Sequence, residues 1–137
     1  MPAVARLLET SLYVADVARS LAFYRGLFGF PVLLEGPRLS ALDAGEGTVL
    51  LLFRRGASAA GVEAPGGTIP PHDGAGPLHL AFAVSADELP AWEERLDALG
   101  IAIDGRMRWD GGGRSVYFRD PDGHSVELAT PGTWATY

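Results

Sequence analysis

Three side chains of metal-binding type stand on separate predicted strands of this chain. Glu9 lies on the first predicted strand, His79 on the strand that opens the second half, and Glu127 on the last strand. Carboxylate oxygens and imidazole nitrogens together favour Mn, Fe, Co, Ni or Zn over Cu(I). These residue types indicate a site for one divalent metal ion, provided that the fold brings the three strands together.

The stretch FRDPDGHSVELAT, residues 118–130, shows how Glu127 is placed. Its Asp-Pro-Asp-Gly segment is typical of a tight turn, because Pro presets φ and Gly accepts a positive φ. The residues after the turn predict a strand. On that strand Ser125 and Glu127 share one face, while Val126 and Leu128 share the other. A carboxylate between two large apolar residues therefore points away from the apolar face.

The two halves of the chain can be laid over each other as a repeat. Residues 9–30 align with 79–101, and residues 40–53 align less tightly with 116–128. The alignment places Glu9 on His79 and Leu51 on Glu127. If two such halves pack through a pseudo-two-fold axis, these four positions meet at a shared cleft, and three of the four are metal-ligand types.

Each half is predicted to contain a strand, a helix and three further strands. The pattern predicts strands at 6–14, 32–35, 39–43, 48–54, 78–84, 101–104, 115–119 and 125–129, and helices at 17–28 and 86–99. The Gly-, Pro- and Ala-rich residues 57–76 predict a long connector, which in a small domain is usually functional or mobile. We therefore expect a single domain with one module at about 4–56 and a second at about 77–130.

Composition narrows the class of protein. The chain has 137 residues, is 47% hydrophobic and 20% charged, and carries a net charge of −6, which fits one globular domain. All 11 basic residues are arginine, which argues against a nucleic-acid groove and excludes lysine Schiff-base chemistry. The absence of cysteine excludes disulfides and thiolate chemistry. With no signal peptide or membrane-length apolar run, we expect a soluble cytoplasmic protein.

The stretches LYVADVARSLAFYRGLFGF and VYFRDPDGHSVEL resemble the vicinal oxygen chelate superfamily, also called the glyoxalase/bleomycin resistance/dioxygenase family. The resemblance covers nearly the whole chain. It implies an α+β fold in which two βαβββ modules form a curved, partly open barrel. Members include glyoxalase-type lyases, epimerases, extradiol dioxygenases, fosfomycin-inactivating thiol transferases and metal-free bleomycin-binding proteins. The enzymes share a divalent metal ion that is chelated by two oxygens of the substrate.

The resemblance also implies a ligand set. Glu9 occupies a place where His or Gln is common, and His79 and Glu127 match the usual histidine and carboxylate. Leu51 departs from the pattern, because glyoxalase-type lyases usually have Glu or Gln there. The expected metal is Zn, Ni, Mn or Fe, held by Glu9, His79 and Glu127. Either glutamate is also a candidate for catalytic proton transfer, and Glu9 has the alternative of hydrogen-bonding a ligand.

Further residues are candidates for the substrate pocket. Ser115 and Tyr117 share one face of their strand, and the resemblance implies that such positions contact substrate. Trp109, beside three consecutive glycines, is either a loop anchor or a pocket wall. Leu51 supplies an apolar wall. The remaining histidines, His72 and His124, are predicted to face solvent, and His72 has the alternative of reaching a cleft if the connector folds over it.

Two functions stay open at this point. The first is a metal-dependent enzyme, of lyase or isomerase type rather than dioxygenase type, acting on a small oxygen-chelating molecule. The alternative is a metal-free drug- or metabolite-binding protein of the bleomycin-resistance type. Leu51 favours the second, and the trio of donors favours the first. In either case we expect a homodimer with no nucleic-acid or membrane partner.

Overall fold

The computed structural model describes residues 1–137, which divide into two compact units, Met1–Ala75 and Gly76–Tyr137. Each unit contains one helix and one four-stranded sheet. The order of strand, helix and three strands is thus present twice, and the predicted α+β class with open sheets is confirmed. Neither helix combines the length and the apolar character needed to cross a membrane.

The sheet of the first unit has the order β1-β4-β3-β2. Its elements are β1 (Glu9–Val14), α1 (Val17–Phe28), β2 (Val32–Leu34), β3 (Leu39–Asp43) and β4 (Val49–Arg54). β1 runs parallel to β4, and the other neighbours are antiparallel. β1 is therefore an edge strand with one neighbour in its own unit.

Helix α1 has the ends that the sequence predicts. The side chain of Asp16 accepts a hydrogen bond from the backbone N–H of Arg19 at 3.0 Å, which caps the first turn. Gly29 ends the helix in the left-handed region at φ 72°. The apolar stripe of α1 packs on β3 and β4. The buried side chains of this core are those of Leu12, Val17, Leu21, Tyr24, Leu27, Leu42, Leu50 and Leu52.

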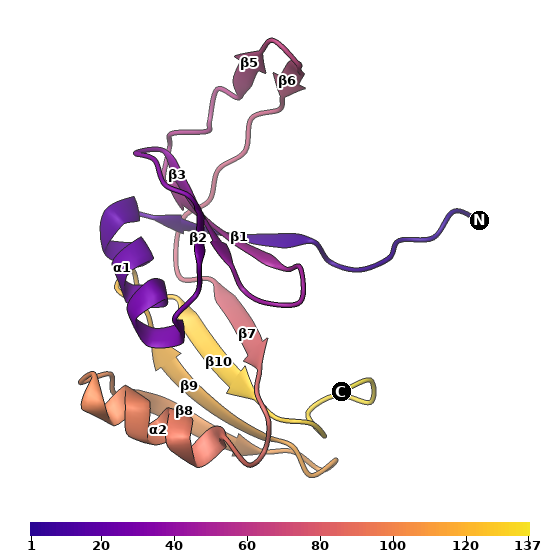
Figure 1. Ribbon diagram of the computed structural model, residues 1–137, viewed down its shortest axis with the longest axis vertical. Coiled ribbons are helices and arrows are strands. Elements are labelled where there is room, and N and C mark those ends of the chain that lie inside the picture. The colour runs from indigo at the N-terminus through magenta and orange to yellow at the C-terminus, as the bar shows by residue number, and fades with distance from the viewer. The chain divides into compact units, whose positions relative to one another are not determined.

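The predicted connector contains a hairpin that the sequence analysis did not find. Strands β5 (Val62–Ala64) and β6 (Gly67–Ile69) pair in antiparallel fashion and project away from the sheet of their unit (Figure 1). Thr68 Oγ1 donates to Glu63 Oε2 across the pair at 2.8 Å. Three-residue strands are too short to show a period-two pattern, so only the Pro-Gly-Gly turn signalled this hairpin.

The sheet of the second unit has the order β7-β10-β9-β8. Its elements are β7 (His79–Ala83), α2 (Leu89–Ala98), β8 (Ile103–Arg108), β9 (Arg114–Arg119) and β10 (Ser125–Ala129). β10 lies parallel to β7 and antiparallel to β9. β7 is thus an edge strand, like β1 in the first unit.

Helix α2 begins later than predicted. Pro90 stands in the first turn, where its missing N–H costs nothing, so the helix starts at Leu89 rather than Ala86. Glu88 is the N-cap residue and has no side-chain cap hydrogen bond. The Ser85 hydroxyl instead closes the turn before the helix, accepting from the backbone N–H of Glu88 and donating to the Glu88 carboxylate. The residues before the helix form turns.

The two faces of the second sheet differ in chemistry. Val116 and Phe118 on β9, with Val126 and Leu128 on β10, are fully buried on one face. The alternating residues of the same strands carry polar groups on the other face. The polar face is the one that positions the candidate site.

Candidate functional site

Glu127 lies at the centre of the polar face of the second sheet. It is buried, although its side chain is ionisable. Its direct cross-strand neighbour is Tyr117, and Ser115 lies diagonally beside it on β9. Because alternation places all three on one face, Ser115, Tyr117 and Glu127 lie together in the structure.

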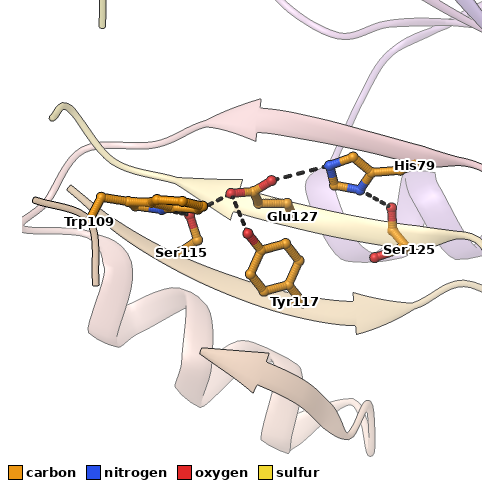
Figure 2. Close-up of polar contacts among 6 residues, drawn as sticks. All are labelled: His79, Trp109, Ser115, Tyr117, Ser125 and Glu127. Atoms are coloured by element: carbon orange, nitrogen blue, oxygen red, sulfur yellow. Dashed lines mark hydrogen bonds and ion pairs between the residues drawn. The ribbon is translucent and has the colours of Figure 1, made fainter. Parts of the chain in front are cut away.

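One oxygen of the Glu127 carboxylate receives two hydroxyl groups (Figure 2). The hydroxyl of Ser115 donates a short hydrogen bond to Oε1, and the hydroxyl of Tyr117 donates to the same oxygen at 3.1 Å. Trp109 in turn donates its indole Nε1–H to Ser115 Oγ at 2.8 Å. The chain of hydrogen bonds Trp109–Ser115–Glu127 holds the carboxylate in one orientation as an acceptor.

The other oxygen of Glu127 faces His79. Nε2 of His79 lies 3.3 Å from Glu127 Oε2. Nδ1 of the same ring donates to the backbone carbonyl of Ser125 at 3.0 Å, so Nε2 is the nitrogen turned toward the carboxylate (Figure 2). The His79 side chain is 54% exposed and that of Glu127 only 9%, so solvent reaches the pair from the histidine side.

Tyr117 is held in its neutral form. Partial burial raises the pKa of its phenol above the ordinary 10.0, and the hydrogen bond to Glu127 and the negative charge of that carboxylate raise this pKa further. The phenol therefore stays a hydrogen-bond donor over the physiological pH range. Tyr117 supports the carboxylate and is not a ready proton acceptor.

Two of the three consecutive glycines allow the Trp109 loop to pack closely on residues 132–133. A Cβ at Gly111 would meet the carbonyl oxygen of Gly132 at 2.5 Å, and a Cβ at Gly113 would collide with the backbone of Gly132 and Thr133. The loop is closed by two backbone hydrogen bonds: the N–H of Trp109 donates to the carbonyl of Gly113, and the N–H of Gly112 donates to the carbonyl of Trp109. Of the two roles predicted for Trp109, the anchor within a closed loop is the one that these contacts support.

Glu9 and Leu51 lie on the first sheet, on the face opposite the α1 core. Register pairs Glu9 with Val49 and Ser11 with Leu51, so all four share one face. Leu51 is partly exposed, whereas its neighbours Leu50 and Leu52 are fully buried. Glu9 is exposed. Both residues thus lie outside the α1 core.

The two further histidines are not simply solvent-facing. His72 is half-buried and shares a 2.8 Å hydrogen bond with the hydroxyl of Tyr13, and its ring stands edge-on to Phe53. The prediction for His124 was wrong, because none of its surface is exposed. The turn before it reverses the chain so tightly that the first residue after the turn enters the interior.

A groove of about 460 Å³ lies elsewhere in the first unit, near the start of α1. Asp16, Glu35, Ser40 and Arg54 contribute polar groups to its wall. None of the predicted site residues lines it. The groove is therefore separate from the chemistry that the sequence predicts.

The donor pair on the second sheet fits a divalent metal ion. Two ligands on one ion at metal–ligand distances near 2.1 Å lie about 3 to 3.5 Å apart, and Nε2 and Oε2 are 3.3 Å apart. The other ring nitrogen of His79, Nδ1, donates its N–H to a backbone carbonyl, and the other oxygen of Glu127, Oε1, accepts a hydrogen bond from Ser115. Hydrogen bonds of this kind usually orient the side chains that bind a metal ion. No group of three histidine or acidic side chains with metal-binding geometry is present in the structure, so the second sheet by itself offers a pair of donors.

Comparison with known proteins places this geometry in a family. The model of the Glyoxalase/Bleomycin resistance protein/Dioxygenase superfamily matches residues 6–128. The chain belongs to this superfamily. The match spans both sheets and includes Glu9, His79 and Glu127.

Several members of the superfamily are similar to the chain over most of its length. Metallothiol transferase FosB of Bacillus licheniformis is 32% identical over 118 residues, covering 85% of this chain and 70% of the relative. FosB of Lysinibacillus sphaericus is 35% identical over 119 residues, with 85% and 76% covered. The crystal structure of lactoylglutathione lyase from Agrobacterium tumefaciens superposes with a TM-score of 0.88 at 35% identity, covering 96% of this chain and 98% of the lyase.

Proposed function

We propose that the protein is a divalent-metal-dependent enzyme that acts on a small molecule through vicinal oxygen atoms. His79 and Glu127 hold the ion from the second sheet, and Glu9 is the third protein ligand. The observation that carries the proposal is the 3.3 Å approach of His79 Nε2 to Glu127 Oε2, with the second atom of each group already hydrogen-bonded. Zn, Ni, Mn and Fe(II) all accept this mixture of donors.

The residues around the pair have separate tasks in this proposal. A bound ion supplies Lewis-acid polarisation of a substrate oxygen. The hydroxyl groups of Ser115 and Tyr117 both donate hydrogen bonds to Glu127 Oε1, so Oε2 is left as the coordinating oxygen. Trp109, through Ser115, fixes the orientation of that carboxylate. The exposed carboxylate of Glu9 is better suited than the hydrogen-bonded Glu127 to accept or deliver a proton.

The relatives favour a substrate class. One group of relatives is named for metallothiol transfer, and the similar crystal structure is that of a lyase acting on a glutathione adduct. We propose that a thiol, or the adduct of a thiol with an oxygen-rich small molecule, takes part in the reaction. Transferase or lyase chemistry is thereby preferred to ring-cleaving dioxygenase chemistry.

We also propose that the active form is a homodimer. β1 carries Glu9 and β7 carries His79, and each is an edge strand with one neighbour in its own sheet. Edge strands expose unpaired backbone groups that readily pair with another chain. A second copy can therefore supply the third ligand. A cytoplasmic location remains a prediction from the sequence.

Metal binding by the chelator-treated protein tests the proposal. Titration calorimetry with Zn, Ni, Mn and Fe(II) is expected to give one ion per chain for the wild type. His79→Ala, Glu127→Ala and Glu9→Ala should each lose most of this binding. Glu94→Ala, which removes an exposed carboxylate from α2, is the matched control and should bind like the wild type.

One observation favours the alternative, a metal-free binding protein. Every buried side-chain nitrogen and oxygen already has a hydrogen-bond partner, so the protein groups alone satisfy Glu127. Under this alternative the wild type binds none of the four metals, and the triple removal of Glu9, His79 and Glu127 leaves the affinity for an oxygen-rich ligand unchanged. Either result would replace the enzyme proposal.

A further inference from the structure

His124 has a fully buried ring that the proposed metal site does not use. Its Nδ1 accepts a hydrogen bond from the backbone N–H of Leu78 at 2.8 Å. A ring nitrogen that accepts from an N–H cannot itself carry a proton, so the His124 Nδ1 is unprotonated. The imidazole thus acts as an acceptor for the backbone of a segment 46 residues away in the sequence.

The Asp-Pro-Asp-Gly turn sets the place of this ring. Asp120 Oδ1 accepts the backbone N–H groups of Asp122 at 3.0 Å and His124 at 2.9 Å. Gly123 takes a φ of 82°, which favours glycine. The backbone N–H of Asp120 closes the turn on the carbonyl of His124. The buried carboxylate therefore fixes the point at which His124 enters the interior.

Leu78 is the residue where the edge strand β7 is attached to its sheet. Its N–H donates to His124, and its carbonyl accepts the N–H of Ser125 at 2.8 Å. The residues before it, Gly76 and Pro77, make no hydrogen bond in the structure. β7 also has only β10 as a neighbour. Ahead of the ladder between β7 and β10, the chain at Leu78 is thus hydrogen-bonded to His124 and Ser125.

We infer that His124 is a positioning residue for His79, an inference that rests on the metal site proposed above. His79 directly follows Leu78, and its Nδ1 donates to the carbonyl of Ser125, the residue after His124. Residues 124–125 therefore hold residues 78–79 at three points: the N–H and the carbonyl of Leu78 and the ring of His79. These contacts set the direction in which His79 Nε2 meets Glu127.

Two amide substitutions test the roles of the two ring nitrogens of His124 one at a time. In His124→Asn the side-chain oxygen takes the place of Nδ1 and keeps an acceptor for Leu78. In His124→Gln the oxygen lies one bond further out, near the place of Nε2, so the Leu78 N–H loses its acceptor. Leu96→Ala, which removes a fully buried apolar side chain of α2, controls for general loss of stability.

Metal-free readouts come first. Nitrogen NMR should show a protonated His79 Nδ1, hydrogen-bonded to Ser125, in the wild type and in His124→Asn, and a loss of this signature in His124→Gln. Hydrogen exchange of the Leu78 amide should accelerate only in His124→Gln. Leu96→Ala should leave both signals as in the wild type. Divalent metal affinity should then fall roughly tenfold to a hundredfold in His124→Gln and stay near wild type in His124→Asn.

The outcomes are distinct. If His124→Gln keeps the wild-type His79 tautomer and Leu78 protection, the inference is wrong. If the wild type binds no metal but His124→Gln still disturbs His79, the positioning role stands and the proposed metal function fails. Should His124→Gln not fold, the wild-type spectrum still decides, because a proton on Nδ1 of His124 would overturn the inference.

Discussion

His79 and Glu127 meet diagonally across two parallel strands, with 3.3 Å between Nε2 and Oε2. In the register of the two strands, His79 pairs with Ser125 and Glu127 pairs with Ala81. The two side chains are therefore two residues apart along the strands and lie on the same face of the sheet. The hydrogen bond from His79 Nδ1 to Ser125 turns the ring along the strand toward Glu127. The direction of one ring thus creates the donor pair, and substitutions that free either side chain should weaken metal binding.

The hydroxyl of Tyr117 should matter for metal affinity. Tyr117→Phe removes one of the two hydroxyl donors to Glu127 Oε1, so the carboxylate can rotate and its affinity for Zn or Ni should fall about tenfold. Tyr137→Phe is the matched control, because that hydroxyl donates to the carbonyls of Val84 and Ala129 and touches neither ligand. Titration calorimetry measures both. Equal affinities for the two variants would contradict the support role of Tyr117.

The pKa of Tyr117 should depend on Glu127. Burial and then the Glu127 carboxylate raise this pKa above 10.0, so Glu127→Gln should lower it while leaving the part due to burial. The raised pKa favours the protonated phenol in the folded state. Its contribution to stability is therefore full below pH 10.0 and is lost as the pH rises through the raised value.

An ultraviolet titration of phenolate formation measures this shift. The difference between wild type and Tyr117→Phe isolates the Tyr117 signal from the other tyrosines. The same difference taken in the Glu127→Gln background should show a lower midpoint. An unchanged midpoint would mean that the Glu127 carboxylate does not raise the pKa of the Tyr117 phenol.

The face of each strand could be read from the sequence, because side chains alternate with a period of two. This alternation predicted that Ser115 and Tyr117 share one face of their strand, and that Glu127 points away from Val126 and Leu128, as the register of β9 and β10 has them. Contacts that depend on backbone positions far apart in sequence could not be read in this way. The bond from Leu78 to His124 is of this kind, since no periodicity reports the direction of a ring that follows a turn.

The structural role of the glycines beside Trp109 could not be predicted from the sequence. The triple glycine predicted only a loop, yet the structure shows that Gly111 and Gly113 allow backbone contact with Gly132 and Thr133. Glycine in a sequence indicates either a special φ or a close approach, and only coordinates tell the two apart. Neither Gly111 nor Gly113 has a positive φ, so here close approach is the reason.

Gly113→Ala should therefore destabilise the second unit and disturb Trp109. The added methyl group collides with backbone atoms that cannot swing aside, at a cost of about 1–3 kcal/mol. Gly66→Ala is the control, because a Cβ there meets nothing within 4 Å. Chemical denaturation gives the stability of each variant, and tryptophan fluorescence follows the Trp109 environment. The idea fails if both variants unfold at the same denaturant concentration.

Leu51 is the position at which the superfamily pattern breaks, and Leu51→Glu tests what its side chain faces. Leu51 lies on the same face as Ser11 and is partly exposed, whereas Leu52 is fully buried in the α1 core. A glutamate at 51 should therefore stay solvated and leave the protein folded. A glutamate at 52 has no partner in the core and should cost on the order of several kcal/mol, so Leu52→Glu is expected to unfold or aggregate.

If Leu51 faces the proposed metal site, Leu51→Glu adds a donor and should raise the affinity for Zn or Ni. The added carboxylate also fills a coordination place that a catalytic ion keeps for water or substrate, so tighter binding should accompany slower turnover. Circular dichroism, calorimetry and a kinetic assay with a thiol co-substrate separate these effects. A folded Leu51→Glu protein with wild-type metal affinity would remove Leu51 from the site, and an unfolded one would show that this face is packed rather than open.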